Sequence, residues 1–189
     1  MIVAHRFLLL IAFTLLLPFS AVAQATTQAA APAELPNFHQ VSDRLYRGAQ
    51  PQESGIKKLR EMGIETIINL REDSRRVQRE KAAAEALGIR YINLPWPSWH
   101  GPLDSQVSEV RNILDNPRMG KTFVHCRRGA DRTGTVFALY RIYHDGWDAD
   151  RALAEAKQLG MRWTQVPKRS YIRKFYEQRQ ATADKSTGK

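Results

Sequence analysis

The chain has 189 residues, of which 29 are Lys or Arg and 19 are Asp or Glu, and its formal net charge is +10. These numbers fit one globular domain and leave no room for two large ones. The single cysteine excludes an internal disulfide and a zinc site built from several thiolates, and the 11 Gly and 9 Pro are too few for a collagen-like or low-complexity chain.

The first 23 residues are typical of a secretory signal peptide. His5 and Arg6 form a short basic start. Residues 7–17 are an apolar run of about eleven residues, too short to cross a bilayer of roughly 30 Å as a helix. Residues 21–23 (AVA) suit a signal peptidase. We therefore expect residues 1–23 to be cleaved and the protein to be exported, periplasmic or secreted, with no stable membrane insertion afterwards. An uncleaved membrane anchor is the alternative.

Two further segments lack the periodicity of a folded element. Residues 24–37 are rich in Ala, Thr and Pro and predict a flexible linker, while the polar residues 181–189 predict a disordered tail. The intervening residues 38–180 are expected to form the one folded domain.

Strand and helix patterns alternate along this domain. Short β-branched runs predict strands, and longer amphipathic runs closed by Gly predict helices. The expected strands are 38–41, 45–47, 66–70, 90–94 and 121–125. The expected helices are 50–62, 74–87, 104–114, 133–144, 148–159 (with Asp148 as N-cap) and 167–179. This alternation implies an α/β fold with a central, mostly parallel sheet flanked by helices on both faces.

One stretch carries most of the chemical information: Val124-His-Cys-Arg-Arg-Gly-Ala-Asp-Arg-Thr-Gly134. It joins a predicted strand to a predicted helix, which is where an α/β sheet places its ligands. A loop around a helix N-terminus can turn its amide N–H groups inward and hold an anion. The same groups would stabilise a thiolate, so we expect the pKa of Cys126 to lie well below the ordinary value of about 8.5.

Arg132 follows Cys126 by six positions, at the start of the predicted helix. Its planar guanidinium can bind two phosphate oxygens and follow the charge that develops in the transition state. Thr133 can donate a hydrogen bond to the sulfur when the thiolate leaves. These parts predict phosphoryl transfer by nucleophilic catalysis through a cysteinyl-phosphate, with no metal or other cofactor.

The loop residues between the cysteine and the helix are expected to bind the substrate phosphate. Gly129 permits a positive φ within this loop. The expected phosphate-binding residues are Arg127, Arg128, Gly129, Ala130, Asp131 and Arg132.

Cysteine and arginine separated by five residues, with His125 before and Thr133-Gly134 after, resemble the signature of the cysteine-dependent protein tyrosine phosphatases. The loop and the small size are most similar to the compact bacterial dual-specificity-like branch, as are residues 45–51 (LYRGAQP) and 66–71 (TIINLR). The resemblance covers roughly residues 38 to 178. It implies that Cys126 is the nucleophile, that Arg132 clamps the phosphate, and that a phosphorylated protein is the substrate.

Members of this family use an Asp on a separate loop as general acid. The equivalent loop, residues 95–104, contains one carboxylate, Asp104, which could act as that acid or cap the next helix. Its distance from Cys126 along the chain is shorter than is usual in the family. His100 and Asp131 are alternative acids. Alternatively, His100 is a surface imidazole, and Asp131 orients Arg132 or a neighbouring loop.

His125 is expected to be partly buried and to support Cys126 through a hydrogen bond to its main chain or to a neighbouring strand. Trp96 and Trp99 could wall the pocket against an aromatic phosphoester or pack within their loop.

The substrate class is left open by the residues. Asp131 and the Arg127-Arg128 pair favour a phosphoinositide or inositol phosphate as an alternative substrate for the same mechanism. Rhodaneses also place a cysteine in a strand-to-helix anion loop, usually one residue shorter, so a sulfurtransferase is a further alternative. Basic residues are spread over every predicted helix, and we expect no nucleic acid partner.

Overall fold

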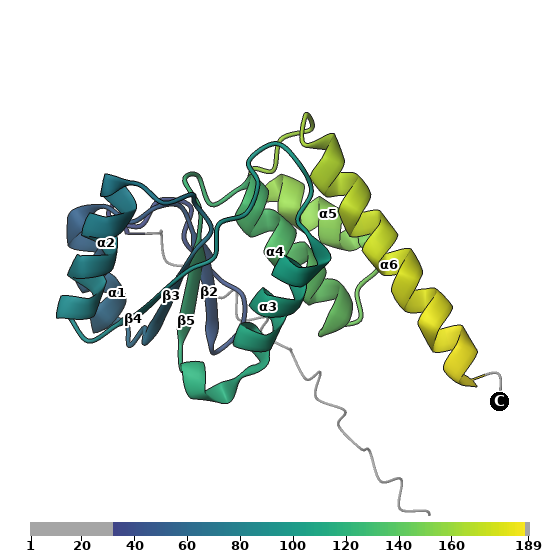
Figure 1. The fold of residues 1–189 in the computed structure, drawn as a ribbon, viewed down its shortest axis with the longest axis horizontal. Helices are drawn as coiled ribbons and strands as arrows, with labels where there is room; N and C mark the ends of the chain where they lie inside the picture. The colour runs from purple at the N-terminus through teal and green to yellow at the C-terminus, as the bar shows by residue number, and fades with distance from the viewer. Residues whose placement is uncertain (1–31, 188–189) are drawn as a thin grey trace, which may run out of the picture.

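The computed structural model describes residues 32–187 (Figure 1). The predicted signal peptide, residues 1–23, and the first part of the predicted linker, residues 24–31, lie outside the described residues. Within residues 32–187, no helix is both long enough and apolar enough to cross a bilayer.

Strands and helices alternate as the sequence predicted. The strands are β1 (His39–Gln40), β2 (Leu45–Gly48), β3 (Thr66–Asn69), β4 (Arg90–Asn93) and β5 (Thr122–His125). The helices are α1 (Glu53–Glu61), α2 (Arg75–Ala86), α3 (Asp104–Asp115), the short 3-10 helix η1 (Pro117–Met119), α4 (Asp131–Tyr143), α5 (Ala149–Gln158) and α6 (Val166–Thr187). Asp148 caps α5 as predicted, with Oδ1 accepting from the Arg151 amide at 2.7 Å.

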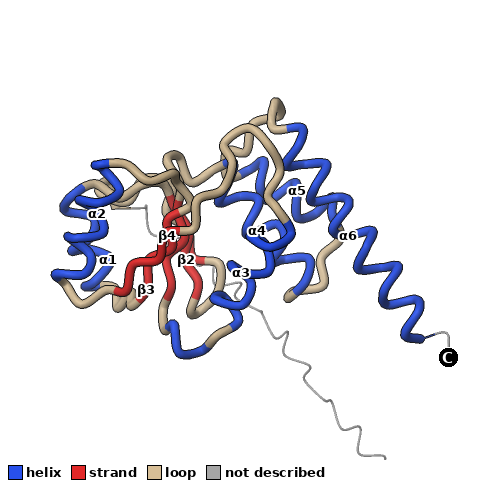
Figure 2. The backbone as a smooth tube through the Cα atoms, in the orientation of Figure 1, coloured by secondary structure: helices blue, strands red, loops and turns tan. Residues whose placement is uncertain are grey.

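The strands form one sheet in the order β1-β2-β5-β3-β4. β1 runs antiparallel to β2, and the other neighbours are parallel. Helices α1 and α2 lie on one side of the sheet and α3 to α6 on the other (Figures 1 and 2). The predicted α/β fold with a mostly parallel, helix-flanked sheet is confirmed.

Side chains of the central strands alternate between two apolar cores, because successive residues of a strand point to opposite faces. Ile67 and Phe123 pack in the core beneath α1 and α2. Ile68 and Val124, one residue further along, pack in the larger core beneath α3 to α6. Helix α4 is buried along nearly its whole length, which explains why its sequence shows no polar face.

The predicted flexible linker, residues 24–37, extends too far toward the domain. Leu35 is fully buried against the core of α1. The carbonyls of Glu34 and Pro36 accept hydrogen bonds from the amides of Gln52 and Ala49, both at distances of 3.0 Å or less. Irregular backbone held by one apolar side chain and scattered hydrogen bonds has no periodic pattern, so this packing could not be predicted from the sequence.

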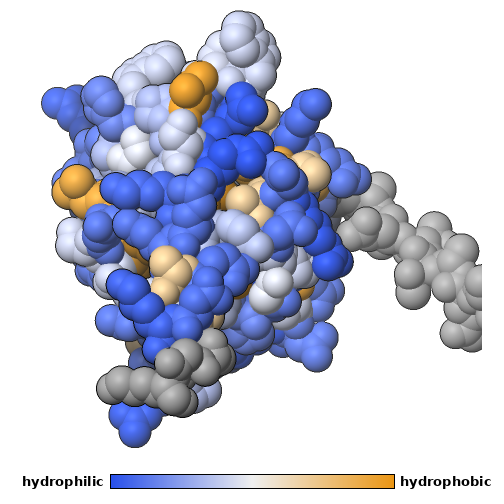
Figure 3. Space-filling model, turned by 90° about the vertical axis from the view of Figure 1, so that its right-hand side faces the viewer, coloured by the Kyte–Doolittle hydropathy of each residue, from blue (hydrophilic) through white to orange (hydrophobic). Residues whose placement is uncertain are grey.

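The predicted disordered tail, residues 181–189, also differs from the structure, because α6 continues to Thr187. Its Ala and Lys residues are good helix formers, and the first glycine after residue 160 is Gly188. Residues 181–185 are all exposed. Because this end of the helix buries no face, its sequence has no apolar periodicity from which a helix could be predicted. On the side of the molecule that carries α6, the surface is mostly hydrophilic, with hydrophobic residues in small separate spots (Figure 3).

Leu35→Ala should lower the free energy of unfolding by about 2–5 kcal/mol, since it leaves a cavity in the core. Leu103→Ala is the control, because Leu103 is largely exposed, and it should change stability by about 0.5 kcal/mol or less. Urea denaturation measures both. Equal, small effects would mean that residues 32–37 are a linker after all.

Candidate active site

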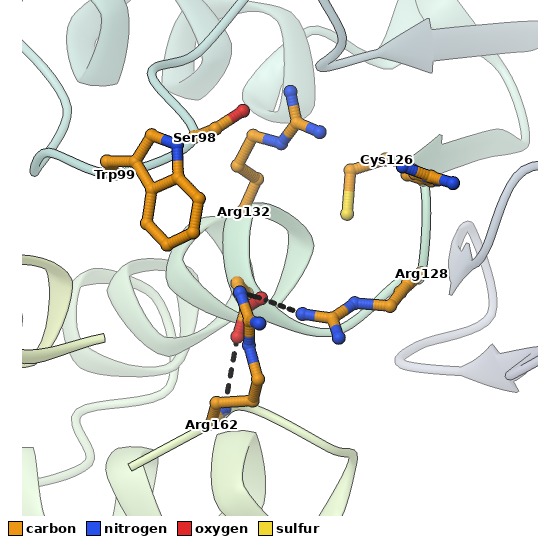
Figure 4. Close-up of a pocket in the computed structure, with 8 residues that line it drawn as sticks. Ser98, Trp99, Cys126, Arg128, Arg132 and Arg162 are labelled. Atoms are coloured by element: carbon orange, nitrogen blue, oxygen red, sulfur yellow. Dashed lines mark hydrogen bonds and ion pairs between the residues drawn. The ribbon is translucent and has the colours of Figure 1, made fainter. Parts of the chain in front are cut away.

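A cavity of about 700 Å³ opens beside the N-terminus of α4, where β5 ends. It joins three separate parts of the chain: the loop after β4, the loop after β5 and the loop before α6 (Figure 4). The lining residues are Ser98, Trp99, Cys126, Arg127, Arg128, Asp131, Arg132 and Arg162.

Cys126 lies at the base of this cavity, only 3% exposed. Its sulfur points into the space between Arg132, Arg128 and Trp99 (Figure 4). Burial alone would raise the pKa of the thiol, but the nearby hydroxyl and amide of Thr133, the charge of Arg132 and the amide of Arg128 lower it below its ordinary value. Within residues 32–187 the Thr133 hydroxyl has no other hydrogen-bond partner, so it is free to donate to the thiolate. The site therefore favours a thiolate.

Helix α4 begins at Asp131, two residues earlier than predicted, so Arg132 lies in its first turn rather than in the loop. Its N-cap, Ala130, supplies no side-chain hydrogen bond. The first amides of the helix are thus left to bind an anion, and the positive end of the helix dipole points at the same place.

The guanidinium of Arg132 is fixed on one side. Nη1 donates to the Leu70 carbonyl at 3.0 Å and to Glu72 Oε2 at 3.1 Å, with the Trp96 carbonyl at 3.5 Å. In residues 32–187, Nε and Nη2 have no hydrogen-bond partner, so these two donors remain for two phosphate oxygens.

Glu72 is a site residue that the sequence reasoning missed. Burial raises the pKa of this carboxyl, but its own main-chain amide, Arg132 and Ser98 lower it below the ordinary value, so Glu72 is a carboxylate that holds Arg132. The available signal was a carboxylate three residues after the end of a buried strand.

Gly129 has the positive φ that the sequence predicted, +68°. A Cβ atom there would lie 2.3 Å from the main-chain carbon of Gly48, closer than any side chain can approach. Both the conformation and the space therefore require glycine at this position.

Asp131 holds two arginines at the rim of the cavity. Its carboxylate accepts from Arg128 Nη2 at 2.6 Å and from the main-chain amide of Arg162 at 3.0 Å. Arg162 Nη2 lies 3.2 Å from the same carboxylate. Dashed lines in Figure 4 lead to Arg128 and to Arg162. Asp131 thus orients a neighbouring loop and Arg128, and among residues 32–187 its carboxylate forms no ion pair with Arg132. Arg127, also at the rim, is exposed.

Neither loop candidate for the general acid lines the cavity, which corrects the expectation for both. Asp104 is exposed in the first turn of α3 and accepts from Tyr171 Oη at 2.6 Å. It is not the cap either, since Leu103 occupies the N-cap position. The imidazole of His100 is exposed outside the cavity, and only its main-chain carbonyl has a role, as an acceptor. Sequence order alone could not show which side of the loop faces inward.

The loop between β4 and α3 is held by Lys168, which the sequence reasoning did not identify. Lys168 is fully buried, and Nζ donates to the carbonyls of Ser98 and His100 and to Gln165 Oε1 at 2.8–2.9 Å. Burial lowers the pKa of Lys168 to about 8. Of the two loop tryptophans, Trp96 packs in the core, whereas Trp99 lines the cavity and is 70% exposed.

His125 supports Cys126 from the other face of the sheet, and it is fully rather than partly buried. Nδ1 lies 3.3 Å from the Cys126 carbonyl, and Nε2 lies 2.9 Å from Glu80 Oε1. Glu80 also binds Arg71 at 2.7 Å and Tyr91 at 2.8 Å. Burial raises the pKa of Glu80, but these three neighbours lower it below its ordinary value.

The remaining predicted residues, Thr133 and Ala130, are both buried at the start of α4. Thr133 lies next to the sulfur of Cys126, and Ala130 is the N-cap of the helix. Among residues 32–187, no group of three or more His, Cys, Asp or Glu side chains could hold a metal ion.

Comparison with known proteins identifies relatives of this chain. A family model described as "DSP-PTPase phosphatase fused to NAD+ Kinase" matches residues 16–174. The chain is 30% identical over 124 residues to the dual specificity protein phosphatase TpbA of Pseudomonas aeruginosa. That match covers 66% of this chain and 55% of the relative, so the chain spans about half the relative's length.

Solved structures of the same relative match the fold. The crystal structure of P. aeruginosa TpbA has a TM-score of 0.67 at 27% identity, covering 82% of this chain and 94% of that one. A crystal structure of a TpbA variant in complex with pTyr has a TM-score of 0.64 at 28% identity, covering 77% and 87%.

Thr133→Ala should raise the pKa of Cys126, because it removes the hydroxyl that stabilises the thiolate. Since the thiolate is lost as the pH falls through its pKa, alkylation by iodoacetamide at pH 6 should slow by roughly tenfold. Thr135→Ala is the matched control, as this buried hydroxyl binds the Asp131 carbonyl instead. Identical alkylation rates in wild type and Thr133→Ala would contradict the assigned hydrogen bond.

Gly129→Ala should reduce turnover of an aryl phosphate by about 100-fold or more, because the added Cβ must push the loop off Gly48 and misplace its donors. Gly88→Ala is the control: Gly88 has a similar φ of +72°, but its Cβ would meet nothing within 4 Å. Equal losses of turnover in the two variants would contradict this explanation, because they would mean that the contact with Gly48 has no effect of its own.

Proposed function

The chain belongs to the DSP-PTPase phosphatase family, and we propose that it hydrolyses phosphotyrosine in proteins through a cysteinyl-phosphate, without a metal ion. The observation that carries the proposal is the buried Cys126, whose thiol pKa is lowered beside an Arg132 with two unused donors. This pair supplies a nucleophile and a clamp for the same phosphate.

In the first step, the Cys126 thiolate attacks phosphorus and the bond from phosphorus to the ester oxygen breaks. The leaving oxygen keeps the electron pair and departs as the phenolate, which then takes a proton from water. Nε and Nη2 of Arg132 bind two equatorial oxygens, and the loop amides bind the developing charge.

In the second step, water attacks the cysteinyl-phosphate and the phosphorus–sulfur bond breaks. The sulfur recovers its electron pair as a thiolate, and inorganic phosphate is released. The Thr133 hydroxyl, which also helps to lower the pKa of the thiol, donates a hydrogen bond to the leaving thiolate.

The absence of a free acid among the lining residues favours tyrosine over serine or threonine esters. Within the described part of the chain, Asp131 is the one carboxylate that lines the cavity, and it is paired with Arg128 and Arg162. General acid catalysis contributes roughly 10²–10⁴-fold. The phenol of tyrosine has a pKa of about 10, so its phenolate can leave without protonation more easily than the far more basic alkoxide of serine or threonine. The exposed Trp99 offers a flat wall for an aromatic ring.

One comparison supports phosphotyrosine as a substrate, because a structure of TpbA holds pTyr. TpbA itself is named a dual specificity protein phosphatase, so its name does not separate tyrosine from serine or threonine esters. Since this chain matches about half of that relative, the substrate remains a proposal for this chain.

A phosphoinositide or inositol phosphate is the second candidate. The observation that favours it is the set of four arginines lining one cavity, Arg127, Arg128, Arg132 and Arg162. Four arginines carry more positive charge than is required to bind a single phosphate. The sulfurtransferase alternative, by contrast, has no support in the family match.

The deciding experiment compares kcat/KM for a phosphotyrosine peptide, a phosphoserine peptide of the same sequence and a short-chain phosphoinositide, each with and without EDTA. We expect the phosphotyrosine peptide to exceed the phosphoserine peptide by roughly 100-fold or more, with no effect of EDTA. Cys126→Ser and Arg132→Ala should each lose about 10²-fold or more, whereas Arg60→Ala, on the exposed face of α1, should not.

A preference for the phosphoinositide would replace the proposed substrate and keep the mechanism. Activity that survives in Cys126→Ser would contradict the mechanism itself.

A further inference from the structure

The loop after β5 has its carbonyls held from outside the cavity. Four successive carbonyls, those of residues 126–129, each have a partner on the far side of the loop. The pairs are Cys126 with His125 Nδ1 (3.3 Å), Arg127 with the Gln50 amide (3.4 Å), Arg128 with Asn37 Nδ2 (3.1 Å) and Gly129 with Arg47 Nη2 (3.0 Å).

This arrangement determines where the loop amides point. A trans peptide unit is planar, and its carbonyl and N–H point in opposite directions. Each carbonyl held outward therefore turns the amide of the following residue, 127 to 130, toward the cavity. The Arg128 amide is among the groups that lower the pKa of Cys126, in agreement with this geometry.

Within the described part of the chain, Arg47 is a buried cation without a neighbouring counter-ion. It is 1% exposed on β2, beneath the loop, with its guanidinium 5.4 Å from the centre of the Phe137 ring. In residues 32–187, Nε and Nη1 have no hydrogen-bond partner and no carboxylate lies within ion-pair distance. A buried cation without such a partner is costly.

Two anions act on Arg47 from a distance. Burial lowers the pKa of Arg47 to about 10; Glu155 and the Cys126 thiolate oppose this shift, and Arg141 adds to it. Glu155 already forms an ion pair with Arg141. Glu155 is the stronger of the two anions that act on Arg47, and the Cys126 thiolate is the second, joined by the phosphate during turnover.

Asn37 holds the preceding carbonyl, that of Arg128, from a conformation that few residues adopt. Its φ is +52°, which asparagine tolerates better than most side chains. Nδ2 donates to the Arg128 and Leu159 carbonyls at 3.1 and 3.2 Å, and Oδ1 lies 3.0 Å from His39 Nε2. This residue lies in the segment that the sequence assigned to a linker.

We propose that Asn37 and Arg47 are positioning residues, which hold the carbonyls of Arg128 and Gly129 outward and so keep the loop amides turned toward the anion. The inference rests on the proposed function where it concerns turnover. Where it concerns the reactivity of the Cys126 thiol, it stands on the geometry alone. It also gives a role to Arg47 within residues 45–51, whose pattern had indicated only a family resemblance.

The first test substitutes Arg47 with Met and with Lys and follows iodoacetamide alkylation of Cys126 against pH. Arg47→Met should raise the alkylation midpoint by about one pH unit and lower kcat/KM for an aryl phosphate roughly tenfold. Arg47→Lys keeps the charge and one donor, and it should recover most of both. Arg44→Met is the matched control, since Arg44 also donates to main-chain carbonyls, those of Leu114 and Asn116, but at the other end of the sheet.

Asn37→Ala tests the same idea without a change of charge. We expect its alkylation midpoint to rise and its inhibition by vanadate to weaken several-fold, while Gln40→Ala, an exposed neighbour, leaves both unchanged. Circular dichroism and thermal melting show whether each variant is folded. If Arg47→Met does not fold, Asn37→Ala decides.

The outcomes separate the two proposals. Alkylation midpoints that match wild type in folded Asn37→Ala and Arg47→Met overturn the positioning role, whatever the substrate. A wild-type protein that turns over no phosphoester, but whose alkylation midpoint rises in these variants, contradicts the proposed function and supports the positioning role.

Discussion

A sulfur that must carry negative charge while almost fully buried is the constraint around which this fold is arranged. Burial raises the pKa of such a thiol, so donors must surround it to reverse the effect. Thr133 and the first amides of α4 supply part of them, and Arg132 supplies a full charge. Even the absence of a side-chain cap on α4 follows, because a capping side chain would take the amides that the anion needs.

Because β5 is pleated, it places the nucleophile on one face of the sheet and the supporting histidine on the other. Val124 and Cys126 face α4, where the cavity opens. His125, between them, faces α2 and reaches Glu80, which also binds Arg71 and Tyr91. A one-residue shift in the strand would exchange the two faces. The apolar positions that fix the register of β5 therefore also place the nucleophile.

Local patterns predicted the elements and the loop after β5, because a strand, a sharp loop and a helix each have a signal within a few residues. The missed residues depend on distant partners. Glu72 meets Arg132 across 60 positions, and Lys168 reaches Ser98 across 70. Asp104 failed for the related reason that its position in a loop says nothing about the direction of its side chain. The packing of residues 32–37 had no pattern to find.

The chain contains a single cysteine, and this bears on how the protein withstands oxidants. A low-pKa thiolate is the form that peroxides convert to sulfenic acid, and many proteins stop there by forming a disulfide with a second, resolving thiol. No such thiol exists in this sequence. A sulfenic acid at Cys126 has three routes left: condensation with a backbone nitrogen, capture by a small external thiol, or further oxidation to the sulfinic acid, which is generally irreversible. The same loop that makes the sulfur reactive thus leaves its recovery to molecules from the surroundings.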